Sequence, residues 1–348
     1  MQPIIYTHDS SSALEQLIGE LSPDKVFILT DTTTEQLCKP RLANCMALRN
    51  ATSIVIEATD ANKTLGALES VWQALVNHGA TRHSLLICLG GGMVTDLGGF
   101  AAATFKRGIN FINIPTTLLA MVDAAVGGKT GINFCGLKNE IGAFREANAV
   151  VVDTNFLNTL DTENLRSGYA EMLKHALLSN AEMWSTHLNF DFANVDYDRL
   201  QNMVAQSIDV KRNIVEQDPT EKGLRKALNL GHTTAHAFES LAMQQGRPML
   251  HGYAVAWGLA GELFLSCNLL GFPTKRMRQT LQFIKATYGK FEFTCDHYEQ
   301  LYQFMLHDKK NVGATINFTL LSDVGNLSLN QHATKQLLFE MFDFLRDG

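Results

Sequence analysis

A chain of 348 residues is long enough for two domains, each with its own hydrophobic core. With 46% hydrophobic and 18% charged residues, its composition is that of a globular protein rather than a disordered or fibrous one. The net charge of −6, without any lysine- or arginine-rich run, argues against a nucleic-acid partner.

The cysteines and the first residues bear on where the protein works. Six cysteines are scattered without a CxxC pair, which indicates reduced thiols in a cytoplasmic protein. The start, MQPIIYTHDSSSALEQ, lacks a basic segment followed by an apolar one, so we expect no signal peptide. We also expect no apolar stretch of membrane-spanning length, and therefore no membrane partner.

Short β-branched runs alternate with helical patterns in the first part of the chain. The runs predicted to be strands are 25–31, 52–58, 84–91, 109–115 and 148–153. Between two of them, residues 63–79 carry apolar residues at helical spacing and end in glycine. This alternation predicts a parallel sheet covered by helices, in an α/β domain that ends near residue 153.

The pattern changes after residue 153 to long amphipathic stretches. The helices predicted there are 163–180, 196–217, 229–243, 252–270, 274–288 and 296–307. One late β run, 314–323, is expected to form a small hairpin or an added strand. Because no repeat or flexible linker separates the halves, we expect a mostly helical second domain packed closely on the first, with a cleft between them.

A triple-glycine turn, Gly90, Gly91 and Gly92, joins a buried strand to a helix. Glycines at a helix N-terminus let backbone N–H groups approach a phosphate, and the helix dipole favours the negative charge. The spacing GGGxxxD is not the usual GxGxxG, and a simple tight turn explains the glycines about equally well. Asp31, at the end of an earlier strand, could hold a ribose hydroxyl or cap a helix. Together these features favour a nucleotide site.

Polar residues lie among glycines and apolar residues in segment 113–144. They are Thr116, Thr117, Asp123, Lys129, Asn133, Lys138 and Asn139. Lysines seldom occur in such surroundings as plain solvated charges. We interpret the segment as a surface that binds phosphate and hydroxyl groups, with a flexible, solubilising loop as the alternative.

Glu171 and Lys174 are three residues apart on a predicted helix, so their side chains are neighbours. An isolated pair of this kind is usually a solvent-exposed ion pair. The residues around this pair are apolar, and buried charges need a partner such as a metal or an anion.

Five polar residues follow one another at helical steps: Glu221, Arg225, Asn229, His232 and His236. If the stretch is helical, they share one face, which is either a solvated surface or part of a buried site. His251 precedes a glycine and another apolar helix. One carboxylate and two histidines from separate elements suit a Zn²⁺ site with an open position. Spacing alone does not decide whether His236 or His251 is the second nitrogen ligand.

Six segments in order carry a family resemblance: GGGMVTDLGGFAAATFKRG, NIPTTLLAMVDAAVGGKTGIN, LKNEIGAF, SGYAEMLKH, EKGLRKALNLGHTTAHAFE and LHGYAVAWG. They resemble the signature segments of the 3-dehydroquinate synthase family, in the sugar-phosphate cyclase superfamily, over about residues 25–323. The resemblance implies an N-terminal Rossmann-like NAD-binding α/β domain, 1–153, and a mostly α-helical metal- and substrate-binding domain, 154–348. It also implies a homodimer that uses NAD and Zn²⁺, or Co²⁺ in its place.

The activity implied is that of a phosphorus–oxygen lyase in aromatic amino-acid biosynthesis. The family converts a sugar-acid phosphate, 3-deoxy-D-arabino-heptulosonate 7-phosphate, to 3-dehydroquinate and phosphate. It does so by transient NAD-dependent oxidation, β-elimination of phosphate, reduction and intramolecular aldol closure.

The resemblance also implies roles for individual residues. The metal ligands are Glu171, His232 and His251, whereas His236 faces the substrate and the elimination step. The residues toward NAD are Asp31, Asp60, Lys63, Gly91, Gly92, Asp96, Thr116 and Thr117, with Asp123, Lys129, Lys138, Thr159 and Leu160 nearer the nicotinamide half. The residues toward the substrate are Lys129, Asn139, Lys174, Lys211, Glu221, Arg225, Asn229 and Lys309 or Lys310. Arg107 reaches the phosphate across the dimer interface.

Three positions depart from the family pattern. Asp60 stands where glutamate is usual, Asn164 replaces a carboxylate, and residues 133–135 read Asn-Phe-Cys instead of Asn-His-Pro. The first two put details of NAD contact in doubt. Three alternatives remain: a sister cyclase for a substrate without a carboxylate, a metal-dependent polyol dehydrogenase, and an inactive NAD-binding sensor.

Overall fold

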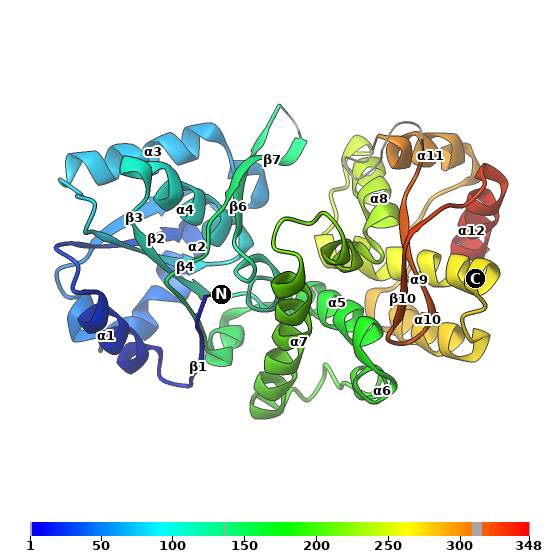
Figure 1. Ribbon diagram of the computed structural model, residues 1–348, viewed down its shortest axis with the longest axis horizontal. Helices are drawn as coiled ribbons and strands as arrows, with labels where there is room; N and C mark the ends of the chain where they lie inside the picture. Colours follow the sequence, from blue (N-terminus) through cyan, green and yellow to red (C-terminus); the bar gives the residue numbers. More distant parts are fainter. Residues whose placement is uncertain (1, 136, 308–314, 348) are drawn as a thin grey trace. The chain divides into compact units, whose positions relative to one another are not determined.

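The computed structural model describes residues 2–135, 137–307 and 315–347 (Figure 1). The chain forms two compact units. Unit 1 comprises Met1–Asp161 and Val195–Arg212, and unit 2 comprises Thr162–Asn194 and Asn213–Gly348. The chain therefore passes between the units three times, whereas the sequence suggested a single division after residue 153. The assignment of cofactor binding to 1–153 and substrate binding to 154–348 stays a prediction.

Unit 1 contains a six-stranded parallel sheet in the order β1-β8-β5-β4-β2-β3. The strands are β1 Ile4–Tyr6, β2 Val26–Asp31, β3 Thr52–Ile56, β4 Leu85–Gly90, β5 Asn110–Pro115 and β8 Ala149–Val152. All five predicted strands are confirmed, and β1 was not predicted. Every residue of β4 is buried, as expected for a central strand with helices on both faces.

Helices cover this sheet and bring glycines close to it (Figure 1). They are α1 Ser10–Leu21, α2 Thr32–Leu37, α3 Leu65–Asn77 and α4 Gly92–Thr104, with short turns at Lys39–Leu42, Met46–Leu48, Asp60–Asn62, Phe105–Arg107, Ala120–Ala124 and Thr154–Thr159. Apolar residues of α3 and α4 form one core cluster with strand residues such as Phe27, Leu86 and Phe111. A Cβ on Gly98 would lie 2.4 Å from Cys88 Sγ, so only glycine allows α4 to pack this closely on β4.

An antiparallel hairpin, β6 Lys129–Phe134 and β7 Leu137–Phe144, follows the sheet's fifth strand in sequence. The sequence predicted a polar binding surface here but not a hairpin. Gly131 and Gly142 face each other across it, and a Cβ on Gly142 would lie 2.1 Å from Thr130 O. The two backbones therefore approach more closely than any side chain allows.

Part of helix α7, Tyr197–Gln217, belongs to unit 1. Thr154 Oγ1 donates to Gln201 Oε1 at 2.9 Å, and Lys211 Nζ lies 2.5 Å from Asp123 Oδ1. These contacts explain why Val195–Arg212 packs with the first 161 residues rather than with the helices around it in sequence.

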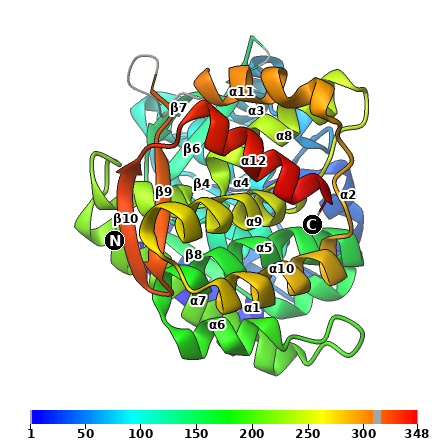
Figure 2. The same cartoon turned by 90° about the vertical axis from the view of Figure 1, so that its right-hand side faces the viewer.

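Unit 2 is mostly helical and is built around α9, His251–Leu270 (Figure 2). Its other helices are α5 Thr162–Ser179, α6 Ala181–Leu188, α8 His232–Gln244, α10 Thr274–Tyr288, α11 Tyr298–Leu306 and α12 Lys335–Asp347, with short turns at Leu224–Asn229 and Cys295–His297. The late β run forms a hairpin, β9 Phe318–Asp323 and β10 Asn326–Gln331, as predicted. The mostly helical second half is thereby confirmed.

The expectation about membrane-spanning length was wrong for α9. This helix has 20 residues and a mean hydropathy of 1.3, enough by length and composition alone to cross a bilayer. However, 67% of that apolar window is buried, and α5, α8, α10, α12 and β9 all contact the helix. A helix that is apolar on all sides is expected at the centre of a helical unit. We therefore interpret α9 as a core helix.

Candidate metal centre and cofactor-binding residues

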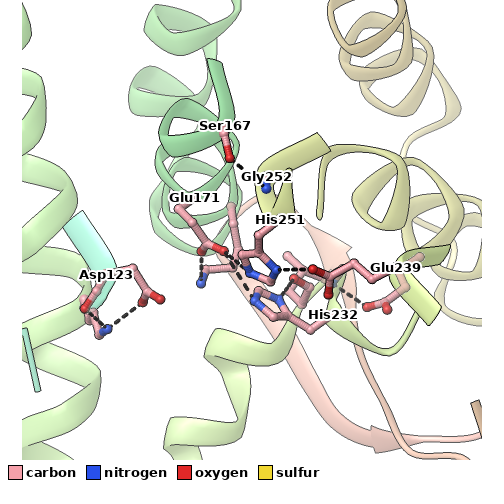
Figure 3. A network of polar contacts seen from close by, with 12 residues as sticks. Asp123, Ser167, Glu171, His232, Glu239, His251 and Gly252 are labelled. Carbon is pink, nitrogen blue, oxygen red and sulfur yellow. Dashed lines mark hydrogen bonds and ion pairs between the residues drawn. The ribbon is translucent and has the colours of Figure 1, made fainter. Parts of the chain in front are cut away.

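Glu171, His232 and His251 come together in unit 2 from three helices (Figure 3). Glu171 lies in the middle of α5, while His232 and His251 are the first residues of α8 and α9. Glu171 Oε1 is 3.3 Å from His232 Nε2 and 3.5 Å from His251 Nε2. Glu171 is fully buried, and Lys174 Nζ pairs with its other carboxylate oxygen, Oε2.

These distances fit a metal ion. Neither carboxylate oxygen of Glu171 has a hydrogen-bond partner of normal geometry among the described residues. Donors about 2.1 Å from a tetrahedral zinc ion lie roughly 3.4 Å from one another, close to the two separations between Glu171 Oε1 and the histidine nitrogens. One carboxylate and two imidazoles leave a fourth position for a substrate oxygen. The three residues thus form a set suited to Zn²⁺ or Co²⁺.

The electrostatics of the three groups also suit a cation. Burial opposes ionisation of Glu171, but Lys174 and His232 hold the pKa of its carboxyl well below the usual value. Burial lowers the pKa of His232 to about 4, so this imidazole is neutral at pH 7. Burial would lower the pKa of His251 as well, but Glu239 and Glu171 raise it to about 10. Two carboxylates flanking one imidazole favour positive charge at this point.

Backbone and side-chain contacts orient both histidines (Figure 3). His232 Nδ1 is 3.1 Å from Leu230 O, which leaves Nε2 directed at Glu171. His251 Nδ1 is 3.4 Å from Glu239 Oε1. Metal-bound histidines usually have such a partner on the second nitrogen. The sequence analysis missed Glu239, although it lies seven residues after His232 and therefore on the same face of α8.

The N-terminus of α9 is held against α5. Gly252 N donates to Ser167 Oγ at 3.0 Å, and Ser167 lies one turn before Glu171 on α5. A Cβ on Gly252 would lie only 1.8 Å from Ser167 O. Glycine after His251 is therefore needed to bring the second histidine to the carboxylate.

His236 lies beside the triad but outside it. Its ring centroid is 5.7 Å from that of His232 and 6.4 Å from that of His251, and the side chain is partly exposed. The residues that could share one ion with Glu171 are His232 and His251. This geometry agrees with a role of His236 toward substrate, which stays a prediction.

The helical stripe predicted from Glu221 to His236 was wrong upstream of His232. Glu221 has φ 61°, residues Leu224–Asn229 form a short 3-10 helix, and Gly231 has φ 83°. The break occurs because Asp218 folds the chain into a loop, accepting from the backbone N–H groups of Lys222, Gly223 and Arg225.

Two pairs of the predicted stripe nevertheless stay together. Asn229 Nδ2 donates to Glu221 Oε1 at 2.9 Å. Arg225 is 1% exposed and donates through Nη1 to Pro219 O at 2.6 Å. A buried guanidinium and this amide–carboxylate pair are groups that can recognise an anionic, hydroxylated ligand.

In unit 1, the glycine turn opens helix α4 as predicted. Gly91 is the N-cap, without a capping side chain, and Thr116 N donates to Gly90 O at 2.9 Å. A Cβ on Gly91 would lie 3.1 Å from Thr117 Cγ2. The first N–H groups of a 13-residue helix are thus presented without a side-chain cap, as a phosphate-binding turn requires.

Lys63, Asp96 and Asn139 meet beside this turn's helix. Lys63 Nζ is 2.5 Å from both Asp96 Oδ2 and Asn139 Oδ1, and Lys63 is almost fully buried. Burial raises the pKa of Asp96, although Lys63 opposes the shift. The structure joins two residues predicted for NAD with one predicted for the substrate.

Asp60 and Lys138 lie at the edge of the same group. Lys138 Nζ is 4.0 Å from Asp60 Oδ2, and Asn133 Nδ2 donates to Asp60 O at 3.0 Å. Asn133 also accepts from Asn139 N through Oδ1. The departures from the family pattern at residues 60 and 133–135 therefore include two positions in direct contact, where the hairpin meets the Asp60 turn.

The remaining cofactor candidates lie near the ends of the strands. Asp31 caps α2, accepting from Thr33 N and Thr34 N through Oδ1. Cys38 Sγ is 3.5 Å from Thr159 Oγ1, and Thr116 and Thr117 directly follow β5. Leu160 follows Thr159 and is partly buried. Asp123 binds Lys211 through both its carboxylate and its backbone oxygen.

Three substrate candidates are not brought to either group by the described residues. Arg107 has φ 68° and lines an open hollow of about 370 Å³ with Thr81, Arg82 and Lys106. Lys129 is exposed at the start of β6. Lys309 and its neighbour Lys310 lie outside the described residues.

Comparisons with known sequences match both halves of the chain. Residues 53–167 match the 3-dehydroquinate synthase N-terminal family model, and residues 168–311 match the C-terminal model. A 3-dehydroquinate synthase from Parabacteroides distasonis is 51% identical over 347 residues, covering 100% of this chain and 98% of the relative. Another from Leptospira interrogans is 39% identical, covering 92% and 89%.

Solved structures share the fold at low identity. A 2-deoxy-scyllo-inosose synthase with carbaglucose-6-phosphate, NAD⁺ and Co²⁺ has a TM-score of 0.85 at 21% identity, covering 99% of this chain and 96% of its own. A 2-epi-5-epi-valiolone synthase from Streptomyces hygroscopicus with NAD⁺ and Zn²⁺ has a TM-score of 0.83 at 23% identity, covering 100% and 97%. The fold likeness extends to an iron-containing alcohol dehydrogenase from Thermotoga maritima, with a TM-score of 0.68 at 12% identity, covering 100% and 98%. The fold alone thus does not separate these enzymes, but the family models and the full-length identity of 51% do: this chain belongs to the 3-dehydroquinate synthase family.

Proposed function

We propose that this chain converts 3-deoxy-D-arabino-heptulosonate 7-phosphate to 3-dehydroquinate and phosphate. The observation that carries the proposal is the buried set of Glu171, His232 and His251, with ligand-to-ligand separations that suit a tetrahedral metal. It occurs in a chain related over its whole length to 3-dehydroquinate synthases. The enzyme acts as a cytoplasmic homodimer.

Two bound groups supply chemistry that side chains lack. Zn²⁺ or Co²⁺ held by the triad polarises a substrate hydroxyl, and NAD⁺ held in unit 1 accepts hydride from the carbon that carries it. The fold neighbours that contain NAD⁺ with Zn²⁺ or Co²⁺ support this pairing.

Residues of unit 1 bind the dinucleotide. The uncapped N–H groups at Gly91 and Gly92 bind its pyrophosphate, and Asp31 Oδ2 accepts from a ribose hydroxyl. All hydrogen bonds of the Asp31 carboxylate to described residues use Oδ1, which leaves the second oxygen for this contact. The group around Lys63 and Asp96 lies toward NAD, together with Asp60, Thr116, Thr117, Asp123, Lys138, Thr159 and Leu160.

Residues of unit 2 hold the substrate. Lys174 and the buried Arg225 supply positive charge, and the Asn229–Glu221 pair orients hydroxyl groups. His236, next to the metal triad and partly exposed, moves the proton during phosphate elimination. Lys129, Asn139, Lys211 and Lys309 complete the substrate contacts, and Arg107 reaches the phosphate from the second subunit.

The direct test is phosphate release from the sugar-acid phosphate by purified protein with catalytic NAD⁺ and zinc. Sedoheptulose 7-phosphate and glucose 6-phosphate serve as controls for a sister cyclase. A cyclase regenerates its cofactor, whereas a polyol dehydrogenase accumulates NADH in proportion to product. Absence of phosphate release from protein loaded with zinc and NAD⁺ would contradict the proposal.

Two variants separate the roles of the neighbouring histidines. His232→Ala should lose zinc and nearly all activity, because two protein ligands remain. His236→Ala should keep zinc and NAD binding but release phosphate on the order of 10²–10⁴-fold more slowly in a single turnover. Zinc lost from His236→Ala but retained in His232→Ala would reverse the assignment.

A further inference from the structure

We infer that Glu262 is a positioning residue that aims His232 at the metal by capping the helix on which His232 lies. The inference rests on the proposed metal triad, but Glu262 itself does not belong to that triad. The argument starts from a defect at the beginning of α8. The N-cap residue there is Gly231, which has no side chain to accept from the N–H groups of the first turn.

Glu262 supplies the missing acceptor from another helix. It lies in α9, is fully buried, and accepts from Gly231 N through Oε2 at 2.6 Å. Its second oxygen, Oε1, accepts from Thr234 N at 3.3 Å. These two N–H groups flank His232 on both sides in sequence. A carboxylate at a helix N-terminus also interacts favourably with the helix dipole.

Close packing makes the contact possible. Gly258 lies one turn before Glu262 on α9, and a Cβ there would be 2.0 Å from Gly231 O. A Cβ on Gly231 would in turn lie 2.9 Å from Leu259 Cδ2. Two glycines therefore allow α9 to cross directly over the start of α8, so that a glutamate on the same face of α9 reaches its backbone.

The consequence for the metal concerns one rotatable group. As the first residue of α8, His232 would share any fraying of an uncapped helix end. With Gly231 N and Thr234 N bound to Glu262, the backbone on both sides of His232 is fixed, and its Nδ1 remains beside Leu230 O. Metal affinity depends on such outer contacts because they set the direction of the ligand nitrogen.

The test compares Glu262→Gln and Glu262→Ala with a matched control, Thr280→Val. Gln keeps the shape of Glu262 and one acceptor oxygen, whereas Ala keeps neither. Thr280 is fully buried on α10 and accepts from Trp184 Nε1 at 3.0 Å, so its replacement removes a buried hydrogen bond that does not involve α8. Zinc affinity is measured by competition with a chromophoric chelator, and coordination geometry by the visible absorption of the Co²⁺-loaded protein.

We expect zinc affinity to fall about 10-fold in Glu262→Gln and about 100-fold in Glu262→Ala, with altered Co²⁺ absorption bands in both. Thr280→Val should keep the wild-type affinity and spectrum even where its thermal midpoint falls as far as that of Glu262→Gln. Wild-type zinc affinity and Co²⁺ spectrum in the folded Glu262→Gln and Glu262→Ala variants would overturn the inference. If Glu262→Ala does not fold, the isosteric Glu262→Gln alone decides, by the same two measurements.

The proposed metal centre fails in a different way. If the wild-type protein binds no zinc, or if His232→Ala binds it unchanged, the triad assignment is wrong and the inference about Glu262 falls with it. Zinc bound by the wild type and lost from His232→Ala, with no effect of Glu262 replacement, leaves the triad intact and removes only the role of Glu262.

Discussion

Gly252→Ala tests how tightly the metal triad depends on one missing methyl group. Gly252 follows the ligand His251, and an added Cβ would lie 1.8 Å from Ser167 O and 2.5 Å from Ser167 Cα. Both contacts are to backbone, so no side chain can turn away. Restoring ordinary contact distance requires α9 to move from α5 by about 1.5 Å at this point.

That displacement separates the two helices that carry Glu171 and His251. Overpacking of this kind costs about 1–3 kcal/mol, which lowers the unfolding temperature of a unit of this size by roughly 2–12 °C. A metal site tolerates about 0.2 Å of error in ligand distance. We therefore expect zinc affinity to fall by a factor of about 100 or more, comparable to the loss of an outer-contact network or greater.

The assay is zinc competition with a chromophoric chelator, together with a thermal scan of the metal-free protein. Gly19→Ala is the matched control, because Gly19 is an exposed residue of α1 with nothing within 4 Å of the added Cβ. There the substitution should stabilise the helix by up to about 1 kcal/mol and leave zinc affinity unchanged. A Gly252→Ala protein with wild-type zinc affinity and melting temperature would refute the reasoning.

Three further perturbations have defined outcomes. Lys63→Met leaves Asp96 without its buried cation and should destabilise unit 1 by about 3–5 kcal/mol in urea unfolding, while the double variant with Asp96→Asn should lose less. In Asp218→Asn the pH dependence of stability should change. Hydrogen bonds from the backbone of Gly223 and its neighbours lower the pKa of Asp218, so its stabilisation is present above the unfolded pKa, near about 3.9, and disappears as pH falls through the lower folded value. The difference in thermal midpoint between wild type and Asp218→Asn should therefore be constant from about pH 5 to 7 and vanish at the acid end; a difference that grows toward low pH would contradict this. Finally, zinc at about 100 times its dissociation constant should stabilise the protein by about 2.7 kcal/mol; EDTA should abolish this, and a variant lacking a triad histidine should show no EDTA effect.

The sequence predicted best where the physical signal is local and periodic. All five predicted strands and the helices of unit 2 follow from β-branched runs and 3.6-residue spacing. Glu171 and His251, 80 residues apart, were joined by the family resemblance and not by periodicity. Helix spacing indicated only that His232 and His236 share a face, and it left the second nitrogen ligand open.

The errors arose where a backbone contact at long range overrides a local pattern. The stripe from Glu221 to His236 has perfect helical spacing, yet Asp218 captures the N–H groups of the following loop and Gly231 turns the chain. The β6–β7 hairpin was missed because its pairing depends on Gly131 and Gly142, 11 residues apart and without side chains to signal a strand. Glu262 looked like an isolated charge on an apolar helix, since its partners lie on α8.

The division of α7 between the units has a consequence for synthesis on the ribosome. Unit 1 is not complete at Asp161, because it also needs Val195–Arg212, including the lysine that binds Asp123. At about 5–20 residues per second, the ribosome needs roughly 3–10 s to add the intervening stretch. During that interval α5, already bearing Glu171, has left the ribosome before either histidine ligand has been translated. Domain-by-domain cotranslational folding is therefore closed to this chain: the N-terminal half must wait for Arg212, and a gene truncated after residue 153 or 161 should yield an incomplete, aggregation-prone sheet rather than an isolated nucleotide-binding domain.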